Sequence, residues 1–492
     1  MVGFNSYMTL LNKSEVKNIH EASKEILKNT GMMFADKRFL KALDKKGAIV
    51  DYTNFIVKFP EKLLNETTEA IKKDYSEETQ LGFYGDGSSK TGYLWGGGPA
   101  IFYLDYENQD LRRGTENDAL SIIRFADTVK QISEVCNTML VYDADKKGNS
   151  IDPKLWTIKS TALTAKNTCK FSYSENIHSV KELEFIRQIG EVILEDPQKI
   201  KERPPFSITK CAISPLKLEK NECEILYYLA TNGFMCGLGS MPIAGATAPA
   251  TLAGTIVLTN AEMLAMGAAI KAINPKTRVY FVSFLSIMDM KSGNISYGAP
   301  ESLLQNIGFQ EFLSHIYNVK PHLNSFYLDG KLPGVQSAME RTVYNLSSIA
   351  FGMKALNDFG SLYHSQIISL EQAVVDLERT AWMEKFCKGI EINDETLAVD
   401  AIKRVGIGGN YLADIHTIKH FRDEFWIPKI TDRAVAQELT LKSYLESDML
   451  KTAQKKVRNI LKDYEPYSVD NYKAEEIDRI VKEAEDYFLR RE

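Results

Sequence analysis

The stretch RVYFVSFL, residues 278–285, is almost continuously apolar, as expected of a strand that is buried on both faces. It follows residues 249–273, a long stretch rich in Ala and Leu that predicts a helix. The helix should end at Asn274-Pro275, because proline lacks the backbone N–H that a helix interior needs. A long helix followed directly by a buried strand is typical of a parallel sheet whose faces are covered by helices.

Other stretches of the chain also predict strands, and helical stretches separate most of them. They are residues 100–104, 139–143, 169–174, 206–212, 234–240, 323–329 and 360–364. With residues 278–285 this makes eight strand–helix units over roughly 270 residues, which fits a closed barrel better than an open sheet. We therefore predict an α/β protein, a TIM-type (β/α)8 barrel with N-terminal and C-terminal helical additions.

The barrel is expected in the middle of a three-part chain. Residues 1–90 predict a mainly helical N-terminal cap, with Ser14 capping a first helix that ends near Gly31. Residues 91–370 hold the predicted barrel. Residues 371–492 are rich in charged, helical stretches and predict an extension that packs on the barrel.

The composition is that of an ordinary globular protein, with 44% hydrophobic and 25% charged residues among 492. The net charge is -5 and no block of Lys and Arg stands out, which disfavours a nucleic-acid partner. The N-terminus does not resemble a signal peptide, and no run reaches the roughly 18 apolar residues of a membrane span. The six cysteines form no CxxC pair, which is typical of a reducing compartment, so we expect a cytoplasmic protein.

Several short motifs favour structural roles over chemistry. The glycine-rich stretches Gly96–Pro99 and Gly406–Gly409 lack the Lys-Ser/Thr of a phosphate-binding loop, so we interpret both as turns. His416 and His420 have a spacing that can hold zinc on a helix, but the Glu of the HExxH pattern and a third ligand are missing. We therefore expect no metal site.

Carboxylates lie at or just beyond the ends of four predicted strands: Asp143, Glu175, Asp289 and Asp329. In barrels of this class the active site is built at the carboxyl ends of the strands. Any one of these carboxylates is more readily explained as the cap of a loop, but four around one rim indicate a site. The candidate catalytic residues are Asp289, Glu175 and Asp329.

Aromatic residues gather near the same strand ends, although some must point outward to the helices. Rings together with carboxylates suit a quaternary ammonium ion, which donates no hydrogen bond and is held by the negative faces of aromatic rings. His364 and Arg341 are candidates to meet a substrate carboxylate, although Arg341 lies in the middle of a predicted helix and could be only a surface cation. The candidate rings are Phe284, Tyr297, Tyr327, Tyr173 and Tyr142.

Several longer stretches, in their order along the chain, resemble the trimethylamine methyltransferase superfamily. They are MPIAGATAPATLAGTIVLTN at residues 241–260, FLSIMDMKSGNISYGAP at 284–300, KLPGVQSAME at 331–340 and VGIGGNYLADIHTIKHFRDEFWIPKITDR at 405–433. Each stretch alone is weakly specific, but together they are typical of this superfamily.

The resemblance implies a TIM-type barrel that passes a methyl group to the Co(I) of a corrinoid on a separate protein. The founding trimethylamine enzymes of the superfamily that this chain resembles carry a pyrrolysine in the barrel. This chain has only standard residues, and its segment Asp329–Lys331 lies near the position expected for the pyrrolysine. The resemblance is therefore to the branch without pyrrolysine, which acts on quaternary amines such as glycine betaine, proline betaine or carnitine. The chain itself should bind no corrinoid, because Asp414–Lys419 has Lys419 where the DxHxxG motif of cobalamin carriers has Gly.

Two other functions remain open on the sequence alone. One is a homologue without catalytic activity that binds a betaine or a protein partner. The other is a metal-dependent lyase or hydrolase on the same barrel, because a fold does not choose its chemistry. A corrinoid protein would dock at the open mouth of the barrel, and a homo-oligomer is compatible with the sequence.

Overall fold

The structure is a computed structural model that describes residues 6–76, 88–89, 92–95, 99–141, 151–196, 200, 204–206, 209–323, 327–355, 359–433 and 448–489. Parallel strands form its centre. Along the chain they are β5 (Gly92–Trp95), β8 (Ile132–Val135), the segment 171–174, Phe206 with β9 (Thr209–Ala212), β11 (Cys236–Ser240), β13 (Val279–Ser283), β16 (His322–Leu323) and β17 (Lys354–Ala355).

Consecutive strands in this order are parallel wherever the described residues show them paired. β5 pairs with β8, and single bridges then join Val135 to Phe171 and Ser174 to Phe206. β9 pairs with β11 and β11 with β13, while β16 pairs with β17. The chain is thus a TIM-type (β/α)8 barrel with helical additions, as the sequence predicts.

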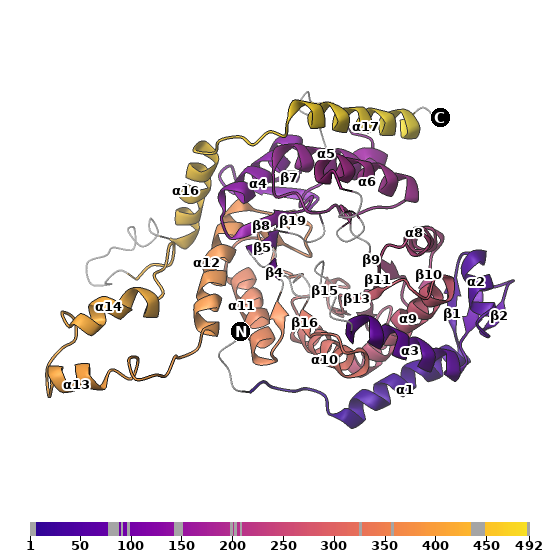
Figure 1. The fold of residues 1–492 in the computed structure, drawn as a ribbon, viewed down its shortest axis with the longest axis horizontal. Coiled ribbons are helices and arrows are strands. Elements are labelled where there is room, and N and C mark those ends of the chain that lie inside the picture. Colours follow the sequence, from indigo (N-terminus) through magenta and orange to yellow (C-terminus); the bar gives the residue numbers. More distant parts are fainter. Residues whose placement is uncertain are drawn as a thin grey trace.

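A helix follows each of these strands and covers the outside of the barrel (Figure 1). Of these helices, α12 lies in the part of the chain that the sequence analysis assigns to the C-terminal extension. The helices are α4 (Glu116–Thr128), α5 (Trp156–Asn167, preceded by the 3-10 turn η1, Pro153–Leu155), α6 (Val180–Leu194), α8 (Lys220–Thr231), α9 (Leu252–Ile273), α10 (Pro300–Tyr317), α11 (Val335–Ala350) and α12 (Leu370–Cys387).

The long helix predicted at residues 249–273 and the buried strand predicted at 278–285 are both present. α9 ends at its C-cap Asn274, and all residues of β13 are buried. By length and hydropathy α9 could cross a membrane, but 83% of its most apolar window is buried inside the protein. It is therefore a core helix of the barrel.

Three predicted strands are wrong in position, because residues 100–104, 139–143 and 360–364 are not the first, second and eighth barrel strands. β5, β8 and β17 take those places a few residues earlier. The parallel bridge between Ala100 and Met139 lies beyond the ends of β5 and β8. Apolar residues after these barrel strands, such as Leu104, Met139 and Leu362, are buried at the rim, so hydrophobicity alone does not distinguish these stretches from barrel strands.

Small sheets at the rim use two of these stretches, 100–104 and 360–364, instead. β6 (Phe102–Asp105) pairs antiparallel with β7 (Asp110–Arg113) and parallel with β19 (Ile367–Ile368), which pairs with β18 (Ser361–Leu362). A second rim sheet has the order β12 (Ile243–Ala244), β14 (Ser286–Met288) and β15 (Ile295–Ser296). β4 (Ser88–Ser89) pairs with β5.

The N-terminal part packs beside α9. α1 (Lys13–Asn29) is capped by Asn12 and not by Ser14, because Asn12 and Glu15 form a reciprocal capping box. The part also contains α2 (Lys37–Asp44), α3 (Glu61–Ser76) and the strands β1 (Met32–Phe34), β2 (Ile49–Asp51) and β3 (Ile56–Lys58). These strands form a sheet of order β10-β1-β3-β2 with β10 (Lys217–Leu218) from the barrel region of the chain.

The C-terminal part divides into packed and projecting segments. α17 (Asn471–Leu489) packs on the barrel helices, with the rings of Phe185 and Tyr487 6.2 Å apart. α16 (Met449–Lys462) lies along α12 (Figure 1). Residues 388–428, called the arm below, contain α13 (Val399–Val405) and α14 (Ile415–Glu424) and extend from α12 away from the barrel (Figure 1).

Candidate active site at the barrel mouth

A cluster of rings forms where several strands end. Phe284 directly follows β13, Tyr297 follows β15, and Tyr327 comes shortly after β16. The rings of Phe284 and Tyr327 stack at 4.8 Å between centroids, and Tyr297 meets the Tyr327 ring edge-on at 5.1 Å. His364, two residues after β18, meets the Tyr297 ring at 5.0 Å. Four sequence-predicted residues from distant segments are thus brought together.

The carboxylate of Asp329 lies at the centre of the polar contacts in this cluster. It accepts hydrogen bonds from His364 Nε2 at 2.9 Å, from the backbone N–H of Tyr297 at 2.9 Å and from the hydroxyl of Ser296. Burial alone would raise the pKa of Asp329, but these hydrogen bonds outweigh it and lower the pKa to about 2. Asp329 is therefore a fixed negative charge beside the rings.

Burial has the opposite consequence for the neighbouring phenol. It raises the pKa of Tyr297 to about 12, so this ring is neutral at physiological pH. A neutral, half-buried ring beside one ionised carboxylate offers a cation both a ring face and a counter-charge. The cluster is thus suited chemically to a bulky cation without hydrogen-bond donors.

The backbone around Asp329 is held by a second carboxylate, that of Glu340 on α11. Glu340 accepts hydrogen bonds from the backbone N–H of Asp329 at 2.8 Å and from that of Gly330 at 3.2 Å. The side chain of Gln336 donates to Glu340 at 2.7 Å and orients it. The first turns of α11 therefore fix the position of Asp329.

Gly298 lies directly against this carboxylate. A Cβ atom at position 298 would lie 2.7 Å from Cδ of Glu340, which is closer than real contacts. We expect Gly298→Ala to displace Glu340 and the Asp329 turn, and to lower the free energy of unfolding by about 1–3 kcal/mol. Denaturant unfolding measures this loss. Gly334→Ala is the matched control, because no atom lies within 4 Å of the Cβ it would add; equal losses in both variants would contradict the explanation.

His364 is presented by an unusual turn. Tyr363, His364 and Ser365 have φ angles of 39°, 55° and 60°, the left-handed region that residues other than glycine rarely adopt. Backbone hydrogen bonds hold the turn, from Tyr363 N–H to Gly330 O and from His364 N–H to Leu328 O, both 2.9 Å. Three consecutive residues of this kind cost roughly 1–3 kcal/mol each, and such strain clusters at functional sites.

Arg341 is neither a surface cation nor a group facing the ring cluster. Its side chain is 2% exposed, lies 3.4 Å from the carboxylate of Asp376 and donates to the carbonyl of Ser361. Asp376 in turn accepts from the backbone N–H of Gly360 at 2.9 Å. The pair thus supports the segment that leads to His364.

Removing this buried cation should be costly. We expect Arg341→Met to lower the free energy of unfolding by about 3 kcal/mol, because Asp376 would remain as a buried carboxylate with Arg379, 3.5 Å away, as its nearest remaining cation. Adding Asp376→Asn to Arg341→Met should restore part of the loss. Chemical denaturation of the two variants checks this, and a double variant less stable than the single one would refute the ion-pair explanation.

The remaining candidates lie apart from the cluster. Asp289 closes an exposed turn between β14 and β15, where its carboxylate accepts from the backbone N–H groups of Lys291 and Ser292. This is the loop-capping role that the sequence analysis favoured for a single carboxylate. Tyr173 is buried and Glu175 half-buried at the end of the third barrel strand, across the barrel from Tyr327. Tyr142 and Asp143 lie outside the described residues.

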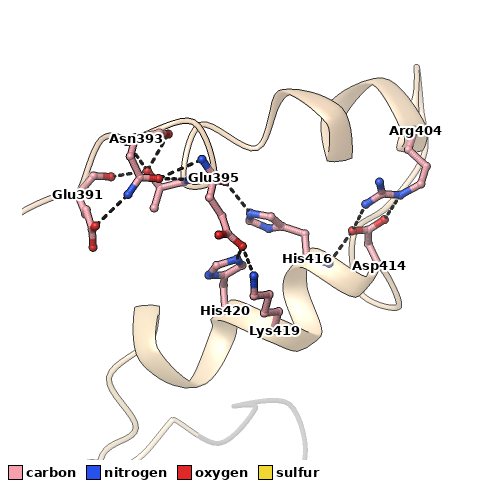
Figure 2. Close-up of polar contacts among 9 residues, drawn as sticks. Glu391, Asn393, Glu395, Arg404, Asp414, His416, Lys419 and His420 are labelled. Carbon is pink, nitrogen blue, oxygen red and sulfur yellow. Dashed lines mark hydrogen bonds and ion pairs between the residues drawn. The ribbon is translucent and has the colours of Figure 1, made fainter.

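The paired histidines of α14 serve the structure of the arm. His416 and His420 lie with ring centroids 4.4 Å apart, and Glu395 engages both residues together with Lys419 (Figure 2). Among the described residues, no group of three or more His, Cys, Asp or Glu side chains could hold a metal ion. Gly406, with φ at 70°, caps α13, so the stretch Gly406–Gly409 is a turn.

Sequence reasoning missed three residues of the mouth: Ser296, Glu340 and Lys331. Nζ of Lys331 lies 4.5 Å from the ring centroid of Tyr363, which stacks on His364 at 4.4 Å. All three lie in the stretches 284–300 and 331–340, which carried the family resemblance. That resemblance is the signal that could have indicated them.

A closed parallel barrel with rings and an ionised carboxylate at the carboxyl ends of its strands has the architecture of the TIM-barrel enzymes. A family model described as "Trimethylamine methyltransferase (MTTB)" matches residues 2–488, and the chain belongs to this family of methyltransferases.

Similar proteins include two named methyltransferases of Desulfitobacterium hafniense. Trimethylamine methyltransferase MttB of strain DSM 10664 / DCB-2 is 26% identical over 96% of this chain and 93% of its own. Glycine betaine methyltransferase of strain Y51 is 27% identical over 94% of each chain. Among solved structures, the monomethylamine methyltransferase of Methanosarcina barkeri covers 99% of this chain and 90% of its own, with 12% identity and a TM-score of 0.49.

Proposed function

We propose that the protein transfers a methyl group from a quaternary amine to the Co(I) of a corrinoid carried by a partner protein. The observation that carries the proposal is the ring cluster of Phe284, Tyr297 and Tyr327 around the ionised Asp329. A quaternary ammonium ion has no N–H to donate, so ring faces and a counter-charge are what can recognise it.

The transfer needs little acid–base chemistry from the protein. An electron pair of the nucleophilic acceptor forms the new bond to the methyl carbon while the C–N bond breaks. The electrons of that bond stay on nitrogen, which leaves as a neutral tertiary amine, so no proton moves and no general acid is required. The protein then has to position the methyl group and exclude water.

One near carboxylate suits this reaction better than several. The positive charge on nitrogen is lost as the C–N bond breaks, so a site that holds the cation too strongly in the ground state would slow the reaction. Asp329 is already engaged by His364, Ser296 and the N–H of Tyr297, which moderates its pull on the substrate. Phe284 and Tyr327 stack on each other, so each ring offers the cation only its outer face.

A betaine also has a carboxylate, which needs a cation at the mouth. Arg341 is occupied by Asp376, so we assign this role to Lys331, whose Nζ lies beside the Tyr363 ring and is 3.4 Å from the carbonyl oxygen of Asp329. His364 is the second candidate. Glu175 and Tyr173, on the opposite strand, are proposed to line the far side of the mouth.

Two further facts support a quaternary substrate. The chain contains only standard amino acids, and the displacement described above requires no special electrophile. A relative over almost the whole chain is named a glycine betaine methyltransferase. The corrinoid is proposed to stay on its carrier, which would reach the substrate from the open mouth of the barrel.

A binding panel tests the substrate class. Glycine betaine, carnitine and choline are compared with trimethylamine and with 3,3-dimethylbutanol, the neutral isostere of choline, by the rise each produces in the unfolding temperature. We expect at least one quaternary amine to stabilise the protein, and the isostere to have little effect at the same concentration. Equal stabilisation by choline and its isostere would contradict recognition of the positive charge.

A further inference from the structure

The arm exposes an unusual amount of apolar surface. Seven of its large hydrophobic side chains are at least 63% exposed: Ile390, Ile392, Ile407, Leu412, Ile415, Phe425 and Ile427. Within the described part of the arm, α14 buries none of its side chains, and α13 buries only Ala401. Apolar surface of this extent on a projecting segment is typical of an interface.

Polar contacts, and not a core, define the shape of the arm. Glu395 joins the first loop of the arm to Lys419 and His420 on α14, and Arg404 of α13 pairs with Asp414 at the start of α14 (Figure 2). A segment of this size without a core has little stability of its own. The base is anchored, because Glu378 of α12 accepts hydrogen bonds from the backbone N–H groups of Lys429 and Ile430. The arm thus has a defined shape, but it packs on no hydrophobic core among the described residues of its own chain.

The same chain has a second uncovered apolar surface on α11. Val335, Met339, Val343 and Leu346 are exposed along one side of this helix. The two charged residues of α11, Glu340 and Arg341, are buried, so in this fully described helix the exposed side has no charge. Interface centres are depleted in charge and enriched in Met.

A groove continues this surface at the carboxyl end of α11. It has a volume of about 490 Å³ and is lined mainly by Tyr7, Met8, Leu346, Ile349 and Phe386. The arm of the same chain extends away from α12 and the barrel (Figure 1) and leaves this surface open. One chain therefore has apolar side chains exposed on the arm and an apolar groove beside α11, and it does not bring the two together.

We propose that the arm packs on α11 and its groove in a second copy of this chain, so that two copies exchange arms around a twofold axis. A twofold pair makes the contact twice, which helps it reach the roughly 1,200–2,000 Å² of a stable interface. The whole chain exposes 24736 Å², whereas a compact monomer of 55.5 kDa would expose about 18,000 Å². The arm contributes to this excess, which the exchange would reduce.

A second copy fits these surfaces better than the corrinoid carrier. A carrier has to dock and leave in every cycle, and interfaces that form transiently are generally smaller and more polar than permanent ones. The arm exposes large apolar side chains among its charged ones, and the exposed face of α11 is free of charge. Permanent burial between identical chains is consistent with both observations.

Molar mass in solution tests the exchange. We expect light scattering on the full chain to give twice 55.5 kDa or an even multiple of it. Ile407→Asp in the arm and Met339→Asp on α11 should each reduce the mass of the assembly and increase its dissociation constant at least a hundredfold. Both residues are exposed, so neither variant should unfold the chain, which circular dichroism verifies. Ile49→Asp, at an exposed apolar position on β2, is the matched control and should leave the mass unchanged.

Cross-linking identifies the surface on which the arm lies. Ile407→Cys protein is mixed with Met339→Cys protein under mild oxidation, and a disulfide between the two chains is expected that neither protein forms alone. A monomeric wild type, or an oligomer that both Asp variants leave intact, would overturn the proposal. An intact oligomer in which Ile407→Asp abolishes only transfer to a corrinoid protein would also overturn it, since the arm would then dock the carrier.

Discussion

Asp329→Asn is expected to lower kcat/KM for the quaternary amine about a hundredfold. The substitution keeps the shape of the side chain but removes the charge that faces the rings and holds His364 at 2.9 Å. Loss of a charged hydrogen-bond partner and counter-ion is worth about 2–3 kcal/mol, which corresponds to roughly this factor in rate. Methyl transfer to cob(I)alamin at several substrate concentrations measures the effect.

The pH dependence of the wild type provides a second test of Asp329. Because its pKa is lowered from 3.8 to about 2, the carboxylate stabilises the folded chain at pH values above about 4, and this contribution is lost as the pH falls through about 2. Asp329 should therefore cause no acidic limb in kcat/KM between pH 5 and 8. Asp289→Asn, in the exposed turn between β14 and β15, is the matched control and should retain near wild-type activity. The reverse pattern, an inactive Asp289 variant and an active Asp329 variant, would contradict the assignment.

Replacing both Phe284 and Tyr327 with Leu is expected to raise KM about tenfold to a hundredfold. Each ring contributes about 0.5–2 kcal/mol to the binding of a desolvated cation, and Leu supplies bulk without the negative face of a ring. The two rings stack on each other at 4.8 Å, so their effects should not be additive. Steady-state kinetics with the two single variants and the double variant measure the coupling.

Loss of bulk has to be separated from loss of the cation–ring interaction. For the wild type, the inhibition constant of the neutral isostere should be far higher than the dissociation constant of the quaternary amine. In the double variant this discrimination should shrink, because the rings favour charge and Leu does not. Unchanged discrimination, with KM unchanged as well, would show that the cation is held elsewhere.

The sequence predicted the fold where burial is continuous. Residues 278–285 are almost continuously apolar and the preceding helix is rich in Ala and Leu, so their structure follows from hydrophobicity and the Asn274-Pro275 stop. At the rim the same reasoning misplaced strands, because β6 and β18 also contain buried apolar residues but pair in small sheets of their own. The arm was not anticipated, since apolar residues in a helical stretch predict a packed face.

The site was predictable in its residue types and less so in its contacts. Phe284, Tyr297, Tyr327 and His364 could be named because they follow strands whose ends meet at one rim. The partner of a charge is set by packing between segments distant in the chain, which no local pattern reveals. Arg341 is buried against Asp376 on the next helix, and Asp289 accepts hydrogen bonds within its own turn, whereas Glu340 holds the turn at Asp329.

The central claim is tested most directly by methylation of free cob(I)alamin, followed by absorbance with the purified protein. Glycine betaine, proline betaine, carnitine, choline and trimethylamine are supplied one at a time. The proposed function predicts that at least one quaternary amine methylates cobalt, that trimethylamine does not, and that Asp329→Asn greatly slows the reaction. No transfer from any quaternary amine, with a cognate corrinoid protein also present, would contradict the account and leave a binding protein on a methyltransferase fold.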